Sequence, residues 1–153
     1  MLRLVLDTNV WLDWLVFDDP GVVPLKTAVQ AGTAAVFIDR ACEQELERVL
    51  AYPRTRTTLD AAAQSACLAA CRRIARDAGA GLTAQPTAGA LPRCRDADDQ
   101  KFLELARDCG ADALVTKDRA LLELGQRKER GAGFQILTPK QVHDALRAGE
   151  AAT

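Results

Sequence analysis

The chain has 153 residues, of which 48% are hydrophobic, and a formal net charge of -1 at pH 7. This length predicts one globular domain at residues 1–147 with a frayed tail at 148–153, and no run approaches the roughly 18 apolar residues that span a bilayer. The small net charge argues against a protein that coats nucleic acid by bulk electrostatics, but it allows a local basic face beside an acidic pocket.

Short apolar runs alternate along the chain with longer segments of helical periodicity, which predicts an α/β fold with a mostly parallel sheet. The runs at 4–6, 34–38 and 113–115 are continuous rather than alternating, as expected for strands covered on both faces. The first run reaches Asp7 too early for a secretory signal, so we expect a cytoplasmic protein.

Helices are predicted between these runs. Pro24 opens a short helix that Gly32 closes, and residues 40–50 form a second helix before Pro53. Residues 58–78 read as the longest helix, with a buried stripe of Leu59, Ala63, Ala66, Cys67, Ala70 and Ile74.

The second half of the chain continues the same alternation. Residues 82–95 hold a short strand at most, because prolines and a glycine interrupt them, and residues 97–109 form a helix. A short helix follows Asp118, and residues 126–133 read as a mobile loop. Residues 134–137 form the last strand, and a terminal helix capped at Thr138 runs to Arg147.

Cysteine and histidine are not expected to carry chemistry. The five cysteines are odd in number and lack paired CxxC spacing, so we interpret them as reduced core residues. The single histidine, His143, is placed on the surface of the last helix, and its isolation argues against histidine-based triads and histidine-rich zinc sites.

Aspartates follow two of the predicted strands. Asp7 and Asp118 lie just past the ends of runs 4–6 and 113–115, and ligands of parallel sheets bind at that edge. Either residue alone is explained equally well as a helix cap or a turn residue. Two such aspartates together indicate a shared site.

A third acidic position lies at the start of helix 97–109, where Asp96, Asp98 and Asp99 crowd together. Asp99 falls on the same face as the apolar residues Phe102, Leu103 and Ala106. No lysine or arginine lies one turn away on that stripe, so a bound cation is a natural partner for a buried Asp99.

Helix 40–50 adds three glutamates. Glu47 projects away from the apolar stripe, whereas Glu43 and Glu45 flank it on opposite sides, and helical geometry does not choose between these two. Asp39 is interpreted as the N-cap of this helix.

Several short motifs together resemble a known family. They are Asp7-Thr8-Asn9, Glu45-Leu46 with Pro53 beyond, the run 95–102, the run 111–118, and Ile136-Leu137-Thr138-Pro139. Their order and spacing, over residues 4–146, are similar to the PIN domain, and most of all to its bacterial branch of toxin components from toxin–antitoxin systems.

The resemblance implies a three-layer α/β/α fold and a ribonuclease site with Mg²⁺ or Mn²⁺ held by acidic residues. It settles the choice of Glu45 over Glu43, and the implied catalytic and metal-binding residues are Asp7, Glu45, Asp99 and Asp118. Supporting positions are Thr8, Asn9 and Thr116, with Asp96 and Asp98 as candidate extra ligands. Products with 5′-phosphate and 3′-hydroxyl ends, a homodimer and an antitoxin partner are also implied.

An RNA substrate needs cations around an acidic pocket. The candidates are Arg54, Arg56, Arg95, Lys117 and Arg119, although any single loop charge is more often simply solvated. Trp11 and Trp14 sit among apolar neighbours and are expected to pack in the core or in a dimer contact rather than to stack bases.

Three other readings compete with the nuclease. A phosphatase of the haloacid dehalogenase type needs an acid where Asn9 stands, and a response-regulator receiver would use Asp39 and leave Glu45 and Asp99 unexplained. The stronger alternative is a non-catalytic module of the same fold that docks a protein partner in its acidic groove.

Overall fold

The computed structural model describes residues 1–54, 58–78, 97–126 and 133–151. In these residues five parallel strands form one sheet, in the order β3-β2-β1-β4-β5. The strands are β1 (Leu2–Leu6), β2 (Ala34–Ile38), β3 (Ala75–Asp77), β4 (Ala113–Val115) and β5 (Gln135–Leu137). The predicted α/β class with a parallel sheet is therefore confirmed.

The strand order reverses direction beside β1. The chain moves outward from β1 to β2 and β3, and then returns to place β4 on the other side of β1. Leu4 is in register with Val36 of β2 and with Ala113 of β4. The carboxyl ends of β1 and β4 therefore lie side by side at a topological switch point, where parallel sheets bind ligands.

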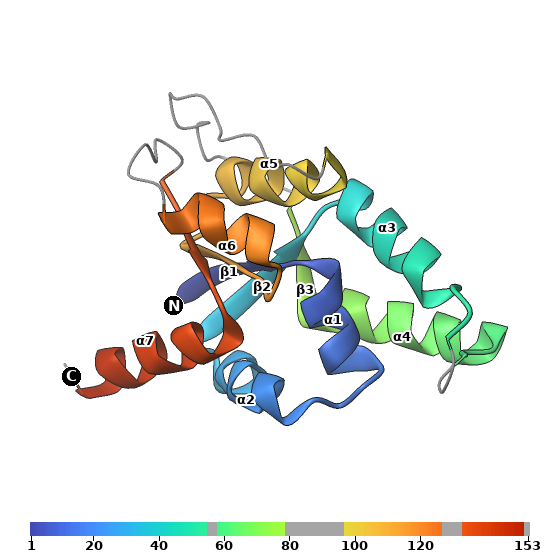
Figure 1. Cartoon of the computed structure of the whole chain (residues 1–153). Coiled ribbons are helices and arrows are strands. Elements are labelled where there is room, and N and C mark those ends of the chain that lie inside the picture. Colours follow the sequence, from blue (N-terminus) through green and yellow to red (C-terminus); the bar gives the residue numbers. More distant parts are fainter. Residues whose placement is uncertain (55–57, 79–96, 127–132, 152–153) are drawn as a thin grey trace.

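Helices cover both faces of this sheet (Figure 1). Helices α5 (Gln100–Asp108) and α6 (Arg119–Gln126) lie above it in the view, and α2 (Val23–Ala31) and α7 (Pro139–Ala151) lie below. Helices α1 (Thr8–Leu15), α3 (Arg40–Leu50) and α4 (Ala61–Ile74) pack against one another. This arrangement is the α/β/α fold that was expected.

The core explains why these segments fold as they do. Every residue of β2 is buried, and β4 is buried throughout, as continuous apolar runs predict. Helix α5 buries Phe102, Leu103, Leu105 and Ala106 against β1 and β4. Trp11 is buried on α1, and its ring centroid lies 5.9 Å from that of Trp14. Of the two expected places for the tryptophans, the core and a dimer contact, the structure shows the core.

The prediction for residues 58–78 is wrong at both ends. Helix α4 begins at Ala61, where the Asp60 carboxylate accepts a hydrogen bond from the Ala63 N–H at 2.7 Å, and it ends at Ile74. Residues 75–77 form β3, which pairs with β2 and overrides their helical periodicity. The predicted stripe also fails at Ala66, which is exposed, and it omits Cys71, which is buried.

Other boundaries differ in smaller ways. Helix α1 was not predicted, and α7 continues to Ala151, past the expected end at Arg147. His143 lies on α7 as expected, where it is half-buried and lines an open cavity of about 310 Å³ between α2 and α7. The strand expected within 82–95 lies outside the described residues, as does most of the loop 126–133.

Several local predictions are confirmed. The Asp39 carboxylate caps α3 by accepting from the Cys42 N–H at 2.9 Å, and Gly32 ends α2 with φ of 79°, a conformation that favours glycine. Cys42, Cys71 and Cys109 are buried free thiols. No helix among the described residues is both long and apolar enough to cross a bilayer.

Candidate active site

Asp7 stands at the centre of the site, directly after β1. One carboxylate oxygen accepts from the Val10 N–H at 2.9 Å and caps α1, and the other accepts from the Thr116 hydroxyl. The side chain is only 4% exposed. Burial, together with the nearby carboxylates of Asp118 and Asp13, raises the pKa of Asp7 to about 6, against the opposing effect of its hydrogen bonds. A carboxylate this costly to ionise indicates a site that needs negative charge.

Thr116 links Asp7 to the second acid of the sheet edge. Its buried hydroxyl donates to Asp7 and accepts from the Asp118 N–H at 2.9 Å. The Asp118 carboxylate accepts from the Leu121 N–H at 3.1 Å and so caps α6. Asp7 and Asp118 therefore both cap helices, as the alternative explanation held. Capping does not exclude a shared site, because it fixes both carboxylates beside the switch point.

Glu45 reaches the same place from α3. One of its oxygens accepts from the Thr8 hydroxyl, and the other lies 2.6 Å from the ammonium of Lys101 on α5. The Arg48 guanidinium, one helical turn along α3, lies 4.0 Å from the same oxygen as Lys101. Thr8 and Lys101 thus hold Glu45 from two neighbouring elements.

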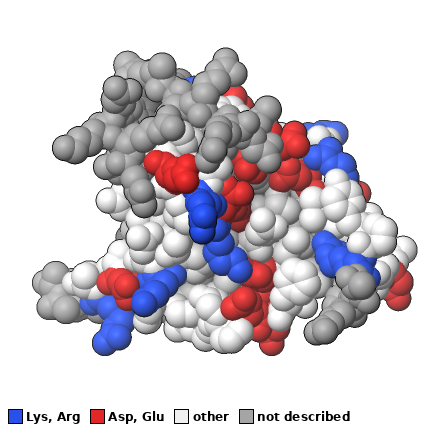
Figure 2. Space-filling model, viewed as in Figure 1, with Lys and Arg blue, Asp and Glu red and all other residues white. Residues whose placement is uncertain are grey.

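These acids line one cavity of about 240 Å³ together with Asp98 and Asp99, which lie in a short 3₁₀ helix (Ala97–Asp99) directly before α5. The remaining lining residues are Thr8, Asn9, Arg48, Val49, Tyr52 and Phe102. Acidic side chains gather in the space-filling view between the α5 side and α3, with basic side chains to either side of them (Figure 2). The four acids implied by the resemblance, which are far apart in the sequence, are brought to one cavity.

The polar groups of this cavity are those that a hard cation prefers. Among the described residues, the lining offers carboxylate, hydroxyl and amide oxygens without a thiol or an imidazole, and Mg²⁺ favours oxygen ligands. Within the described part of the chain, however, no three acidic, thiol or imidazole groups come close enough together to hold one metal ion. Coordination by three of these acids therefore requires their side chains to turn further toward the ion.

A model of the PIN domain matches residues 3–120, a span that contains all four acids. The chain belongs to the PIN domain family. Members of this family are typically metal-dependent nucleases that use divalent ions. No curated protein matches the chain.

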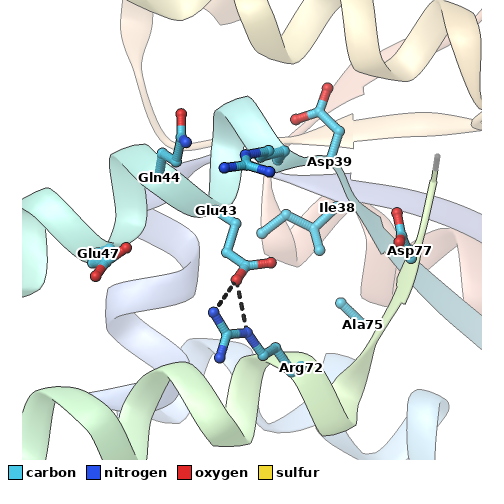
Figure 3. Close-up of a pocket in the computed structure, with 9 residues that line it drawn as sticks. Ile38, Asp39, Glu43, Gln44, Glu47, Arg72, Ala75 and Asp77 are labelled. Atoms are coloured by element: carbon cyan, nitrogen blue, oxygen red, sulfur yellow. Dashed lines mark hydrogen bonds and ion pairs between the residues drawn. The ribbon is translucent and has the colours of Figure 1, made fainter.

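The PIN domain has a second, larger cavity of about 600 Å³, which contains the glutamate that geometry left as an alternative (Figure 3). Glu43 points toward Arg72 of α4, and their atoms approach to 2.6 and 2.7 Å. Asp39, Glu47 and Asp77 line the same cavity. Glu43 and Glu45 therefore face different cavities, and only Glu45 shares one with Asp7.

The predicted substrate-binding cations of the PIN domain are placed differently from one another. The Arg54 guanidinium donates to the Val49 carbonyl at 2.7 Å and holds the end of α3, whereas Lys117 is paired with the buried Asp13, which raises the pKa of Lys117. Arg119 is exposed at the start of α6. Arg56, Arg95 and the candidate ligand Asp96 lie outside the described residues.

Sequence reasoning missed Lys101, Arg48 and Tyr52 at this site. Arg48 follows Glu45 by three residues, a spacing that could have signalled the contact. No such spacing pointed to Lys101. It follows Asp99 by two residues, a spacing that does not bring side chains together on a helix, and its partner Glu45 lies on another helix. Only the packing of α3 against α5 reveals that pair.

Proposed function

We propose that this PIN domain is a ribonuclease that hydrolyses RNA phosphodiester bonds with Mg²⁺ or Mn²⁺. The observation that carries the proposal is the convergence of Asp7, Glu45, Asp99 and Asp118, from four different elements, on one cavity at the switch point. Such a metal, when bound, polarises a phosphodiester oxygen and lowers the pKa of a bound water.

The residues of the chain bind and orient. Asp7 and Asp118 present carboxylates whose directions are fixed by Thr116 and by the first turns of α1 and α6. Glu45 is held in the same cavity by Thr8 and Lys101 and is placed to orient water or to bind the ion. We expect products with 5′-phosphate and 3′-hydroxyl ends.

The test compares two matched aspartate variants. Asp7→Asn removes the central charge but keeps an oxygen that caps α1, and Asp60→Asn makes the same change at the cap of α4, where Asp60 does not line the cavity. With Mn²⁺ and single-stranded RNA, we expect cleavage to fall by at least about 100-fold in Asp7→Asn, the scale of losing one catalytic electrostatic contact, and to persist in Asp60→Asn. Cleavage retained by Asp7→Asn would refute the assignment.

A second candidate is a non-catalytic module that docks a protein partner in the acidic groove. Two observations favour it. Both Glu45 oxygens already have a partner, and no three acids of the described residues lie close enough together to hold one metal ion. Calorimetric titration with Mn²⁺, followed by the cleavage assay, separates the two. Absence of metal binding supports the module, whereas binding with metal-dependent cleavage supports the enzyme.

The biological setting that we propose is the toxin component of a toxin–antitoxin system, acting as a homodimer. This rests on the motifs similar to the toxin branch of PIN domains. A neighbouring gene for a small DNA-binding protein, whose product co-purifies with this chain and suppresses its RNA cleavage, is the expected finding. Sedimentation of the purified chain tests the dimer, and a monomer at micromolar concentration would contradict it.

A further inference from the structure

Three of the acids that line the cavity, namely Asp7, Asp118 and Glu45, differ in the partners that hold them. Asp7 and Asp118 receive hydrogen bonds from neutral donors, namely the N–H groups of Val10 and Leu121 and the hydroxyl of Thr116. These bonds orient the two carboxylates without neutralising their charge. This side of the cavity therefore keeps its attraction for a cation.

Glu45, in contrast, already has a cation beside it. The Lys101 ammonium lies 2.6 Å from one oxygen, and the two side chains are only 22% and 11% exposed. The Arg48 guanidinium adds positive charge 4.0 Å from that oxygen, and the Thr8 hydroxyl occupies the other. An ammonium is a compact point charge, so it fills the same electrostatic role at Glu45 that a metal ion would fill.

We propose that Lys101 takes the place of a second metal ion, so that the site binds one divalent cation, on the side of Asp7 and Asp118. This inference rests on the proposed function and specifies its metal stoichiometry. A second divalent ion bound by Glu45 would have to displace the ammonium or lie within a few ångströms of it, and the two positive charges would repel each other. Lys101 is thus a positioning residue that keeps Glu45 oriented and charge-balanced.

The experiment counts bound Mn²⁺. Calorimetric titration of the full chain is expected to give one ion per chain for the wild type and for Lys101→Arg, which keeps the charge. Lys101→Met, which removes it, is expected to bind two. The matched control is Lys26→Met, because Lys26 is 23% exposed and pairs with Asp18 at 2.9 Å outside the cavity, and it is expected to bind one ion.

A second readout does not depend on the variants folding equally well. Electron paramagnetic resonance of Mn²⁺-loaded wild type is expected to show isolated ions, whereas two ions about 4 Å apart give a spin-coupled spectrum. A coupled spectrum or two ions of similar affinity in the wild type would overturn the inference. So would a count of one in a folded Lys101→Met.

The outcomes also distinguish a failure of this inference from a failure of the proposed ribonuclease function. If the wild type binds two ions and cleaves RNA, the proposed function stands and the role of Lys101 is wrong. If the wild type binds no Mn²⁺ and leaves RNA intact, both are wrong.

Discussion

Asp7 makes the folded protein sensitive to pH in the absence of metal. Its pKa rises from 3.8 to about 6 on folding, mainly because the carboxylate is buried. Between these values the folded state holds a proton that the unfolded chain has released, so stability falls as pH rises from about 4 to about 6. Above pH 6 the ionised group costs on the order of 3 kcal/mol.

Asp7→Asn is therefore expected to raise the midpoint of thermal unfolding above pH 6 in buffer with a chelator, and to have little effect near pH 4. The cap of α1 survives, because the amide oxygen still accepts from the Val10 N–H. Thermal scans between pH 4 and pH 8 measure the effect, with Asp60→Asn as the control at an exposed cap. An unchanged midpoint at pH 7 would show that the charge of Asp7 is not costly.

Glu43 and Glu45 give a residue-scale test of the site. Glu45→Gln is expected to reduce Mn²⁺-dependent cleavage by about 100-fold or more, since Glu45 shares the cavity with Asp7. Glu43→Gln breaks an ion pair with Arg72, whose side chain is 63% exposed, and should leave cleavage intact and cost no more than about 1 kcal/mol. Rates from single-turnover assays decide, and equal losses in the two variants would contradict this separation of cavities.

Glu43 and Glu45 also show how much of the site could be predicted from the sequence at the scale of single residues. Helical projection placed both glutamates beside the apolar stripe but did not choose between them, and family likeness made the choice. The partners that distinguish them, Lys101 for Glu45 and Arg72 for Glu43, come from α5 and α4. Such contacts depend on which helices are neighbours, and that information is not in the periodicity of α3.

At the scale of elements, α6 depends on a close approach to β5 at Gly125. A Cβ added there would lie 2.9 Å from Ile136 Cβ and 3.3 Å from the Ile136 carbonyl oxygen. Gly125→Ala, which normally favours a helix, is therefore expected to destabilise the fold by roughly 1–3 kcal/mol through overpacking.

The control for that change is the glycine of α7. A Cβ at Gly149 meets nothing within 4 Å, so Gly149→Ala should be neutral or stabilise by up to about 1 kcal/mol. Denaturant unfolding of both variants measures the difference. If Gly125→Ala proves as stable as Gly149→Ala, α6 is free to move away from β5.

The sequence predicted the elements whose own residues favour a helix or a strand. It did not predict β3, which is extended because it pairs with a neighbouring strand. Strand β2 is an uninterrupted apolar run, and α3 has a capping aspartate before it and a proline after it. Strand β3 has only three residues, two of them charged, and continues directly from α4. Its extended form comes from pairing with β2, which no property of the segment itself encodes.

Across the whole molecule, the alternation of strands and helices predicted a parallel sheet, but the sheet order was not predicted. That order is what brings β4 back beside β1 and so places Asp118 next to Asp7. We expected Asp7 and Asp118 to share one edge of the sheet because each follows a strand. That expectation is confirmed because their strands, β1 and β4, flank the switch point. Had β3 lain between them, the same sequence pattern would have left the two aspartates apart.

This convergence predicts that metal binding stabilises the entire fold. The acids come from the ends of β1 and β4, from α3 and from the 3₁₀ helix before α5, so the unfolded chain has no comparable site. A ligand that binds only the folded state adds about 2.7 kcal/mol at 100 times its dissociation constant. Mn²⁺ should therefore raise the thermal midpoint of the wild type by several degrees.

Asp7→Asn should lose most of that increase, while it starts from a higher midpoint without metal, because the variant lacks the buried charge that the ion would neutralise. The two effects have opposite signs and one cause, so they test the arrangement of the whole site together. Differential scanning calorimetry with Mn²⁺ and with chelator measures both. An equal Mn²⁺ shift in wild type and Asp7→Asn would place the ion elsewhere in the molecule.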